Sequence, residues 1–202
     1  MILYFETNFL MSIGTGRDPQ ANTLLQNTPS SVQLVMPSIC YMEALSALEQ
    51  EQKYRRRLEN EINLQISQLR RDVTSTHARN LLALLEQSKT ENKELIKDVE
   101  MRIFEAIHQI ASKVQMIELT AETIRQHRVM PLFDQDHTDN LLLYCILHHA
   151  YCHPTESKAF LSSNSREFRQ VEVQDALRNA GVTNYFTRTQ DFLAWLQSQP
   201  SS

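Results

Sequence analysis

Short apolar runs alternate with helical segments along most of the chain, and this alternation limits most strongly what the chain can fold into. Apolar runs typical of strands occupy residues 2–5, 32–36, 158–162 and 184–187. Segments with helical spacing of apolar residues lie between these runs and after the last one. Strands that alternate with helices favour a parallel sheet covered by helices on both faces. We therefore predict an α/β protein with three layers, α/β/α, around a central, mostly parallel sheet.

The middle of the chain is predicted to be helical. Gly and Pro are scarce, at 3 and 6 of 202 residues, so few positions force the chain to turn. A long helix begins at about Ser38 and continues past Arg57. After a break at 72–76, two further helices are predicted at 77–87 and 91–113. We expect one domain over residues 1–202, with residues 50–113 as a helical insertion within it.

Composition limits the partners and the location of the protein. The formal net charge is −4, so binding of a nucleic acid would need a local basic patch or a metal ion. The three cysteines lack zinc-type spacing, and Cys40 and Cys145 lie in apolar helical runs, as buried free thiols do. The amino terminus lacks the features of a signal peptide, and no apolar run approaches the roughly 20 residues that cross a bilayer. We expect a cytoplasmic protein without a membrane partner.

The predicted insertion carries charges of both signs, which leaves two interpretations open. Glu51, Lys53 and Glu59 alternate in sign with neighbouring arginines, as on a solvated helix face. The alternative is an RNA-contacting patch formed by arginines 55–57 together with arginines 70 and 71.

Four segments place a carboxylate where a predicted strand ends or a helix begins. The carboxylates belong to Glu6, Glu43, Asp139 and Glu167. In a parallel α/β sheet such positions converge on one edge. Carboxylates held together repel one another unless a hard divalent cation lies among them. The four segments therefore predict a Mg²⁺ or Mn²⁺ site, and with it phosphodiester chemistry.

Three of the four carboxylates also have a simpler explanation. Glu6 could lie in an exposed loop, and Glu43 could be a surface acid on a helix. Asp139 stands in the first turn of a strongly apolar helix, where the helix dipole alone favours an acid. Asp134 and Asp136 precede that helix and could substitute for Asp139. The order of the four segments along the chain is therefore more informative than any one of them.

The four segments resemble those of the PIN domain family of metal-dependent ribonucleases. In that family a first strand ends in Asp-Thr-Asn, a Glu follows a Ser on an early helix, an Asp opens a late helix, and a later strand ends in Thr-Asn-Asp-x-Asp-Phe or a close relative. The matching segments here are Glu6-Thr7-Asn8, Ser38 with Glu43, Asp139-Asn-Leu-Leu-Leu-Tyr144 and Ser163-Asn-Ser-Arg-Glu-Phe168. The resemblance covers residues 1–45 and 120–197 and leaves the middle insertion unexplained.

The resemblance implies roles for particular residues. Glu6, Glu43 and Asp139 would ligate or orient the metal, Mg²⁺ or Mn²⁺, and with Glu167 they would form the catalytic set. A second group would contact the substrate; it consists of Asn8, Asn164 and Ser165, and Asn8 could instead hold the first acid. Ser165 stands at the position of the family's fourth acid, and Glu167 would replace that acid.

Two functions follow from the resemblance. The first is a Mg²⁺- or Mn²⁺-dependent endoribonuclease with RNA as its partner, in one version a toxin or defence effector held inactive by another protein. The alternative is a catalytically degenerate PIN-like scaffold that acts through protein contacts of its helical insertion. Glu6 in place of Asp and the loss of an acid at Ser165 favour the scaffold, whereas Glu43 and Asp139 favour the enzyme. The long helices need apolar cover, which predicts a homo-oligomer or a regulatory protein partner.

Overall fold

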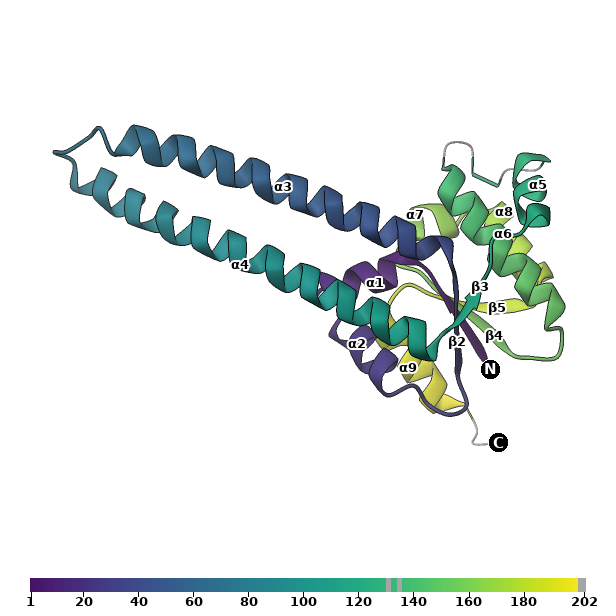
Figure 1. Cartoon of the computed structure of the whole chain (residues 1–202). Helices are drawn as coiled ribbons and strands as arrows, with labels where there is room; N and C mark the ends of the chain where they lie inside the picture. Colours follow the sequence, from purple (N-terminus) through teal and green to yellow (C-terminus); the bar gives the residue numbers. More distant parts are fainter. Residues whose placement is uncertain (130–131, 134–135, 200–202) are drawn as a thin grey trace.

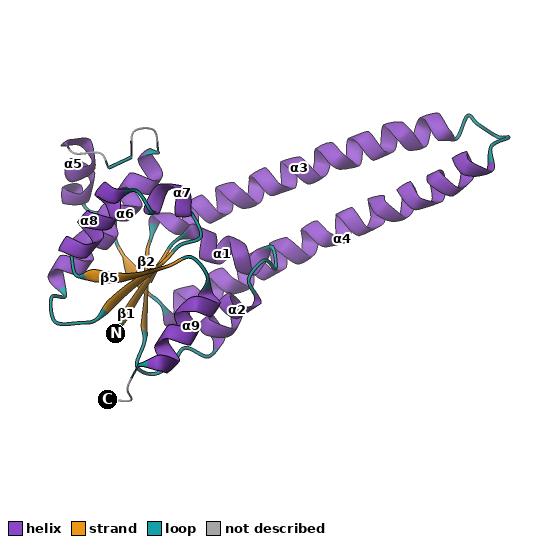
Figure 2. Cartoon of the chain, turned by 180° about the vertical axis from the view of Figure 1, so that it is seen from behind, coloured by secondary structure: helices purple, strands orange, loops and turns teal. Residues whose placement is uncertain are grey.

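The computed structural model of the chain describes residues 1–129, 132–133 and 136–199. In these ranges five strands form one parallel sheet in the order β3-β2-β1-β4-β5. Figure 2 draws the strands of the sheet in orange. The strands are β1 (Ile2–Phe5), β2 (Gln33–Pro37), β3 (Gln115–Ile117), β4 (Lys158–Leu161) and β5 (Val182–Phe186). The parallel sheet confirms the predicted α/β fold class.

The central position of β1 explains why its sequence is entirely apolar. All four residues of β1 are buried, and the strand pairs with β2 on one side and β4 on the other. Leu3, for example, is in register with Leu34 and Ala159. The chain passes from β1 to β2 in one direction and later adds β4 on the opposite side, so the connections reverse at β1. Ligand sites in parallel sheets form at the carboxyl ends of the strands beside such a reversal.

Helices cover both faces of the sheet, which confirms the predicted three layers (Figures 1 and 2). The helices of one layer are α1 (Thr7–Gly14), α2 (Pro19–Gln26) and α9 (Thr189–Ser198). Those of the other are α5 (Ala121–Val129), α6 (His137–Cys152), α7 (Ser165–Phe168) and α8 (Val171–Asn179). One hydrophobic core extends across all three layers. Among the described residues, no helix combines the length and the apolarity needed to span a membrane.

Two long helices form an antiparallel hairpin that extends away from the sheet (Figure 1). They are α3 (Ile39–Leu69) and α4 (Thr76–Lys113). The turn between them confirms the predicted break. There the Asp72 carboxylate accepts hydrogen bonds from the backbone N–H groups of Thr74 and Ser75, at 3.1 and 3.0 Å. The hairpin therefore begins near residue 39, and the division of the chain into one domain with an insertion at 50–113 stays a prediction.

The predicted break between residues 87 and 91 is wrong, because α4 is one continuous helix. Ser88 and Thr90 donate their hydroxyl hydrogens to the carbonyl oxygens of Leu84 and Glu86. Both bonds reach the carbonyl four residues earlier in the same helix, an arrangement in which the segment remains helical. Lys89 also approaches Glu59 of α3 to 4.0 Å, so a polar segment without Gly or Pro stays helical against its neighbour.

The base of the hairpin packs on α1 through a glycine. A Cβ atom at Gly14 would lie 2.1 Å from Cγ1 of Ile103, closer than any real contact. Ile103 is fully buried and forms a small apolar cluster with Leu48 and Val99. Gly14 therefore lets α1 and α4 approach closely where the hairpin joins the sheet domain.

Candidate functional site

Glu6 is a buried carboxylate at the carboxyl end of β1. It is the N-cap of α1, and its Oε2 accepts a hydrogen bond of 2.6 Å from the backbone N–H of Asn8. Only 2% of Glu6 is exposed, and its Oε1 is buried without a hydrogen-bond partner among the described residues. Burial raises the pKa of Glu6 from 4.5 to about 7, and the nearby Glu43 adds to the shift. A buried carboxylate oxygen without a donor fits a site that receives a cation or a ligand.

Glu43 lies on the second turn of α3 and is held by Thr7, whose hydroxyl donates to Oε2 of Glu43. Burial raises the pKa of Glu43, and the charges of Asp136 and Glu167 raise it further. The interpretation of Glu43 as an ordinary surface acid is therefore not supported, because other carboxylates face it from α6 and α7.

Asp139 lies in the first turn of α6 and is buried. The N-cap of that helix is Asp136, whose Oδ1 accepts from the backbone N–H groups of Thr138 and Asp139, at 3.0 and 2.9 Å. A helix dipole acting alone would lower the pKa of Asp139. Burial and the neighbouring acids instead raise it, so the dipole does not explain this residue.

Asn164 connects the acid on α6 to the acid on α7. Its Nδ2 donates to Oδ2 of Asp139 at 3.1 Å and also to Oε2 of Glu167. The one-turn helix α7 was not predicted, and it turns Glu167 back toward Asp139. The hydrogen bonds of Glu167 lower its pKa while that of Asp139 is raised, so the two carboxyl groups differ in their affinity for a proton.

Three carboxylates come close enough to share one ion. In the described ranges, Asp136, Asp139 and Glu167 each offer an oxygen, and these oxygens all lie within 4.8 Å of one another. Carboxylate oxygens suit hard divalent cations. Burial raises the pKa of Asp139, and the neighbouring carboxylates raise it further, so a cation in the site would favour its charged form. The donor set therefore fits a divalent metal ion. Asp134, the other predicted substitute for Asp139, lies outside the described residues.

A comparison with family models agrees with this geometry. The model described as PIN domain matches residues 3–168, which is most of the chain. The chain belongs to the PIN domain family. That family is of a nuclease type and generally uses divalent metal ions, in accord with the acidic cluster. Searches of curated proteins and of solved structures find no match.

In this PIN domain the predicted site residues are close but do not form a single group. Asp139 and Glu167 belong to the compact cluster, whereas Glu6 and Glu43 are not among its members in the described part of the chain. The charge of Glu43 nevertheless raises the pKa of both Glu6 and Asp139. The cluster also contains Asp136, which the predicted metal set left out.

The three predicted substrate residues lie around the acids. Asn8 binds Glu6 through its backbone and lines a pocket beside the acids. Asn164 bridges two acids, as described above. Ser165 begins α7, and its backbone N–H donates to the carbonyl of Ser163 at 2.8 Å. Contact of these residues with a substrate stays a prediction.

Proposed function

We propose that this PIN domain is a Mg²⁺- or Mn²⁺-dependent endoribonuclease that hydrolyses phosphodiester bonds at the acidic site. One observation carries the proposal: Asp136, Asp139 and Glu167 come together at the carboxyl edge of the sheet, where Glu6 and Glu43 add two further buried or half-buried acids. Such a density of carboxylates raises the free energy of the folded protein unless a cation is present. The membership of a nuclease-type family makes RNA the proposed substrate.

The residues divide into ligands and residues that position the ligands. Asp136, Asp139 and Glu167 would hold the metal ion, and Glu6 and Glu43 would complete or orient the site. When bound, a divalent cation would supply Lewis-acid chemistry, which activates water and stabilises charge on phosphate oxygens.

Neighbouring polar groups keep these carboxylates in place. Asn164 fixes the relative position of Asp139 and Glu167, and the hydroxyl of Thr7 fixes Glu43. The backbone N–H of Asn8 holds one oxygen of Glu6 and leaves the other without a donor in the described structure. These contacts set the geometry of the acids before a substrate arrives, so little reorganisation is needed during reaction.

The position of Glu167 supports its proposed role as the replacement for the family's fourth acid. Ser165 removes a carboxylate at the family's position, and α7 brings Glu167 to Asp139 two residues later. The longer side chain of Glu6 reaches one methylene further than Asp would. On this proposal, the two departures from the family pattern alter the shape of the site and preserve its acidity.

A cleavage assay tests the proposal. We expect purified protein to cleave labelled single-stranded RNA with Mn²⁺ or Mg²⁺ and to lose this activity in EDTA. Asp139→Asn and Glu43→Gln should each lower the rate by on the order of 100-fold, because each removes a charge from the site without changing its size much. Asp98→Asn, an exposed acid on α4, is the matched control. Cleavage that is unchanged in both site variants would contradict the proposal.

Exposed apolar residues favour a second function for the hairpin, namely contact with a second copy of this chain. On one side of the hairpin seam they recur at helical spacing: Tyr54, Leu58, Leu81, Leu84 and Leu95. Asn92 donates to the backbone carbonyl of Arg55 at 3.1 Å, which brings the turn of Leu95 level with Tyr54. Residues 39–113 carry twelve Lys and Arg and twelve Asp and Glu, so two hairpins would not repel each other.

The same charges argue against RNA as the partner of the hairpin. Arg55 pairs with Glu51 and Arg70 with Glu86, each at 2.9 Å. The guanidinium of Arg57 lies 5.8 Å from the ring centre of Tyr54. These contacts favour the interpretation of the hairpin as a solvated helix face with charges of both signs over that of an RNA-contacting arginine patch. The toxin or defence role stays a prediction.

A further inference from the structure

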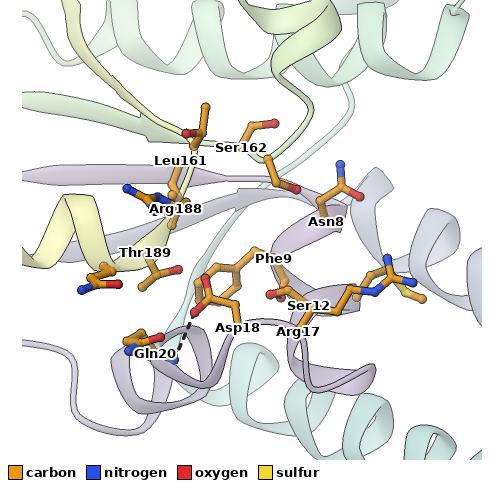
Figure 3. A pocket seen from close by; sticks show the side chains of 14 residues that line it. Asn8, Phe9, Ser12, Arg17, Asp18, Gln20, Leu161, Ser162, Arg188 and Thr189 are labelled. Atoms are coloured by element: carbon orange, nitrogen blue, oxygen red, sulfur yellow. Dashed lines mark hydrogen bonds between the residues drawn. The ribbon is translucent and has the colours of Figure 1, made fainter.

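A pocket of about 380 Å³ has Asn8 and Ser162 among its lining residues, both of which are labelled in Figure 3. Its lining comes from the first turns of α1, the segment before α2, the end of β4 and the start of α9. Its volume lies within the roughly 300–1,000 Å³ that is usual for small-molecule sites. Neither the acidic cluster nor the function proposed above uses this pocket.

The pocket adjoins the acids through two residues. Asn8 lines it with its side chain and binds Glu6 through its backbone N–H at 2.6 Å. Ser162 lines it as well, and its hydroxyl accepts from the backbone N–H of Asn164, the residue that bridges Asp139 and Glu167. A molecule in the pocket would therefore lie next to any phosphate group at the acidic site.

The lining combines an apolar surface with polar groups. Phe9, Met11 and Leu161 supply the apolar part, and Phe9 lies at the centre of the lining in Figure 3. Gln20 and Gln190 supply amide groups that can donate and accept hydrogen bonds. A planar heterocycle with polar edges suits such a lining better than a purely apolar or a purely ionic ligand does.

Cationic groups lie at the border of the pocket. The guanidinium of Arg188 is held by both oxygens of Asp191 at 2.8 Å, which fixes its direction and offsets its charge. Arg17 is exposed and forms no ion pair with any carboxylate of the described residues. The one acid among the described lining residues, Asp18, is the N-cap of α2, and its Oδ1 accepts from two backbone N–H groups of that helix at 3.1 and 3.2 Å. Arg17 is thus a cation available to an anionic group, such as a phosphate, at the edge of the pocket.

We propose that this pocket binds the nucleotide adjacent to the scissile phosphate, with its base on the apolar surface of the pocket and a phosphate near Arg17. The inference rests on the proposed nuclease function and adds to it a site that positions RNA and selects among bases. A pocket in this position would let the enzyme hold one nucleotide while the neighbouring phosphodiester bond lies at the acids.

The experiment measures binding separately from cleavage. Each of the four ribonucleoside 5′-monophosphates is titrated into the full chain in EDTA by isothermal calorimetry. We expect saturable binding with a preference among the four bases, weakened about tenfold in Arg17→Gln, which removes a charged hydrogen bond. Gln20→Ala should change the preference among bases, and Arg178→Gln, an exposed arginine on α8, should bind as the wild type does.

The failure of this inference can be told apart from the failure of the proposed function. The pocket proposal is overturned, and the nuclease function stands, if the protein cleaves RNA but does not bind monophosphates. The same holds if it cleaves RNA and binds monophosphates with an affinity that Arg17→Gln and Gln20→Ala leave unchanged. Monophosphate binding that Arg17→Gln weakens, in a protein that cleaves no RNA, supports the pocket and overturns the nuclease. Asp139→Asn is informative in both measurements, because it should lose RNA cleavage and keep monophosphate binding.

Discussion

Glu6 is a residue at which burial and charge conflict. Its pKa is raised from 4.5 to about 7 in the folded protein, so the unfolded chain ionises first as the pH rises. For this group the free energy of unfolding of the metal-free protein is greatest below pH 4.5, falls between pH 4.5 and about 7, and then levels off. We expect Glu6→Gln to remove up to about 3 kcal/mol of this loss. Urea unfolding in EDTA at pH 4.5 and pH 8 measures it.

Asp98→Asn is the control for the pH dependence of unfolding. Asp98→Asn should retain the pH dependence of the wild type, because Asp98 is an exposed acid on the hairpin. An equal loss of stability between pH 4.5 and pH 8 in the wild type and in Glu6→Gln would show that Glu6 ionises as an ordinary solvent-exposed acid does.

Asn164 contacts two members of the acidic cluster. Asn164→Ala removes the amide that joins Asp139 to Glu167, so the two carboxylates lose their fixed separation. We expect the affinity for Mn²⁺ to fall by about 10- to 100-fold, as is usual for groups that orient metal ligands. Calorimetry measures the change, with Asn184→Ala as the control because the Asn184 amide contacts only its neighbour Thr183 in the described structure. Equal affinities in the two variants would argue against a positioning role.

The sequence predicted which acids lie near the carboxyl edge of the sheet better than which of them meet. Glu6, Glu43 and Asp139 were predicted because each follows or precedes an apolar element. Asp136 was predicted only as a possible substitute for Asp139, and it is both the N-cap of α6 and a member of the acidic cluster. Asp136 lies near Glu167 because α7 takes a particular direction after β4. A helix of four residues has too little sequence for this direction to be predicted.

The hairpin packs on α1 at the contact between Gly14 and Ile103. Gly14→Ala places a methyl group against Ile103, which is buried and cannot move away freely. We expect a loss of about 1–3 kcal/mol in the free energy of unfolding, as for other overpacked sites. Thermal or urea unfolding measures this loss.

A second substitution shows whether the clash is the cause. Gly14→Ala combined with Ile103→Ala should be less destabilised than the sum of the two single variants, because the methyl group then enters the space that Ile103 leaves. Additive losses would mean that Gly14→Ala acts in some other way, for example through the backbone of α1.

The exposed apolar side of the hairpin leads to a prediction about oligomeric state. Light scattering at tens of micromolar should give the mass of a dimer for the wild type, and Leu84→Gln with Tyr54→Gln should shift it toward the monomer of 23.5 kDa. Met42→Gln, an exposed apolar residue at the base of the hairpin, should leave the dimer intact. A wild type that is monomeric at this concentration would contradict self-association.

The predicted elements largely match the structure, and the exceptions share a physical cause. The caps formed by Asp18 and by Thr120 with Thr123 are local interactions, which a short stretch of sequence can encode. The continuity of α4 past Ser88 and Thr90 was not predicted, since a polar run without its neighbour resembles a break. Packing of α3 against α4 keeps this segment helical. The sequence of α4 alone does not reveal that packing.

For the molecule as a whole, charge is divided unequally between the hairpin and the sheet domain. The hairpin is neutral by count, so the net charge of −4 resides in the remainder of the chain, which also holds the acidic site. A polyanion such as RNA gains little from this field without a cation. The parallel sheet and its layers could be predicted from the alternation of strands and helices. The strand order β3-β2-β1-β4-β5 could not, because pairing partners far apart in the chain decide it.

The most direct test of the account is whether the carboxyl edge of the sheet binds a divalent cation. Mn²⁺ is titrated by isothermal calorimetry at pH 7.5 into the wild type, Asp139→Asn and the control Asp98→Asn. We expect saturable binding in the wild type and in the control, and its loss in Asp139→Asn. Absence of binding at millimolar Mn²⁺, or binding that Asp139→Asn leaves unchanged, would contradict it.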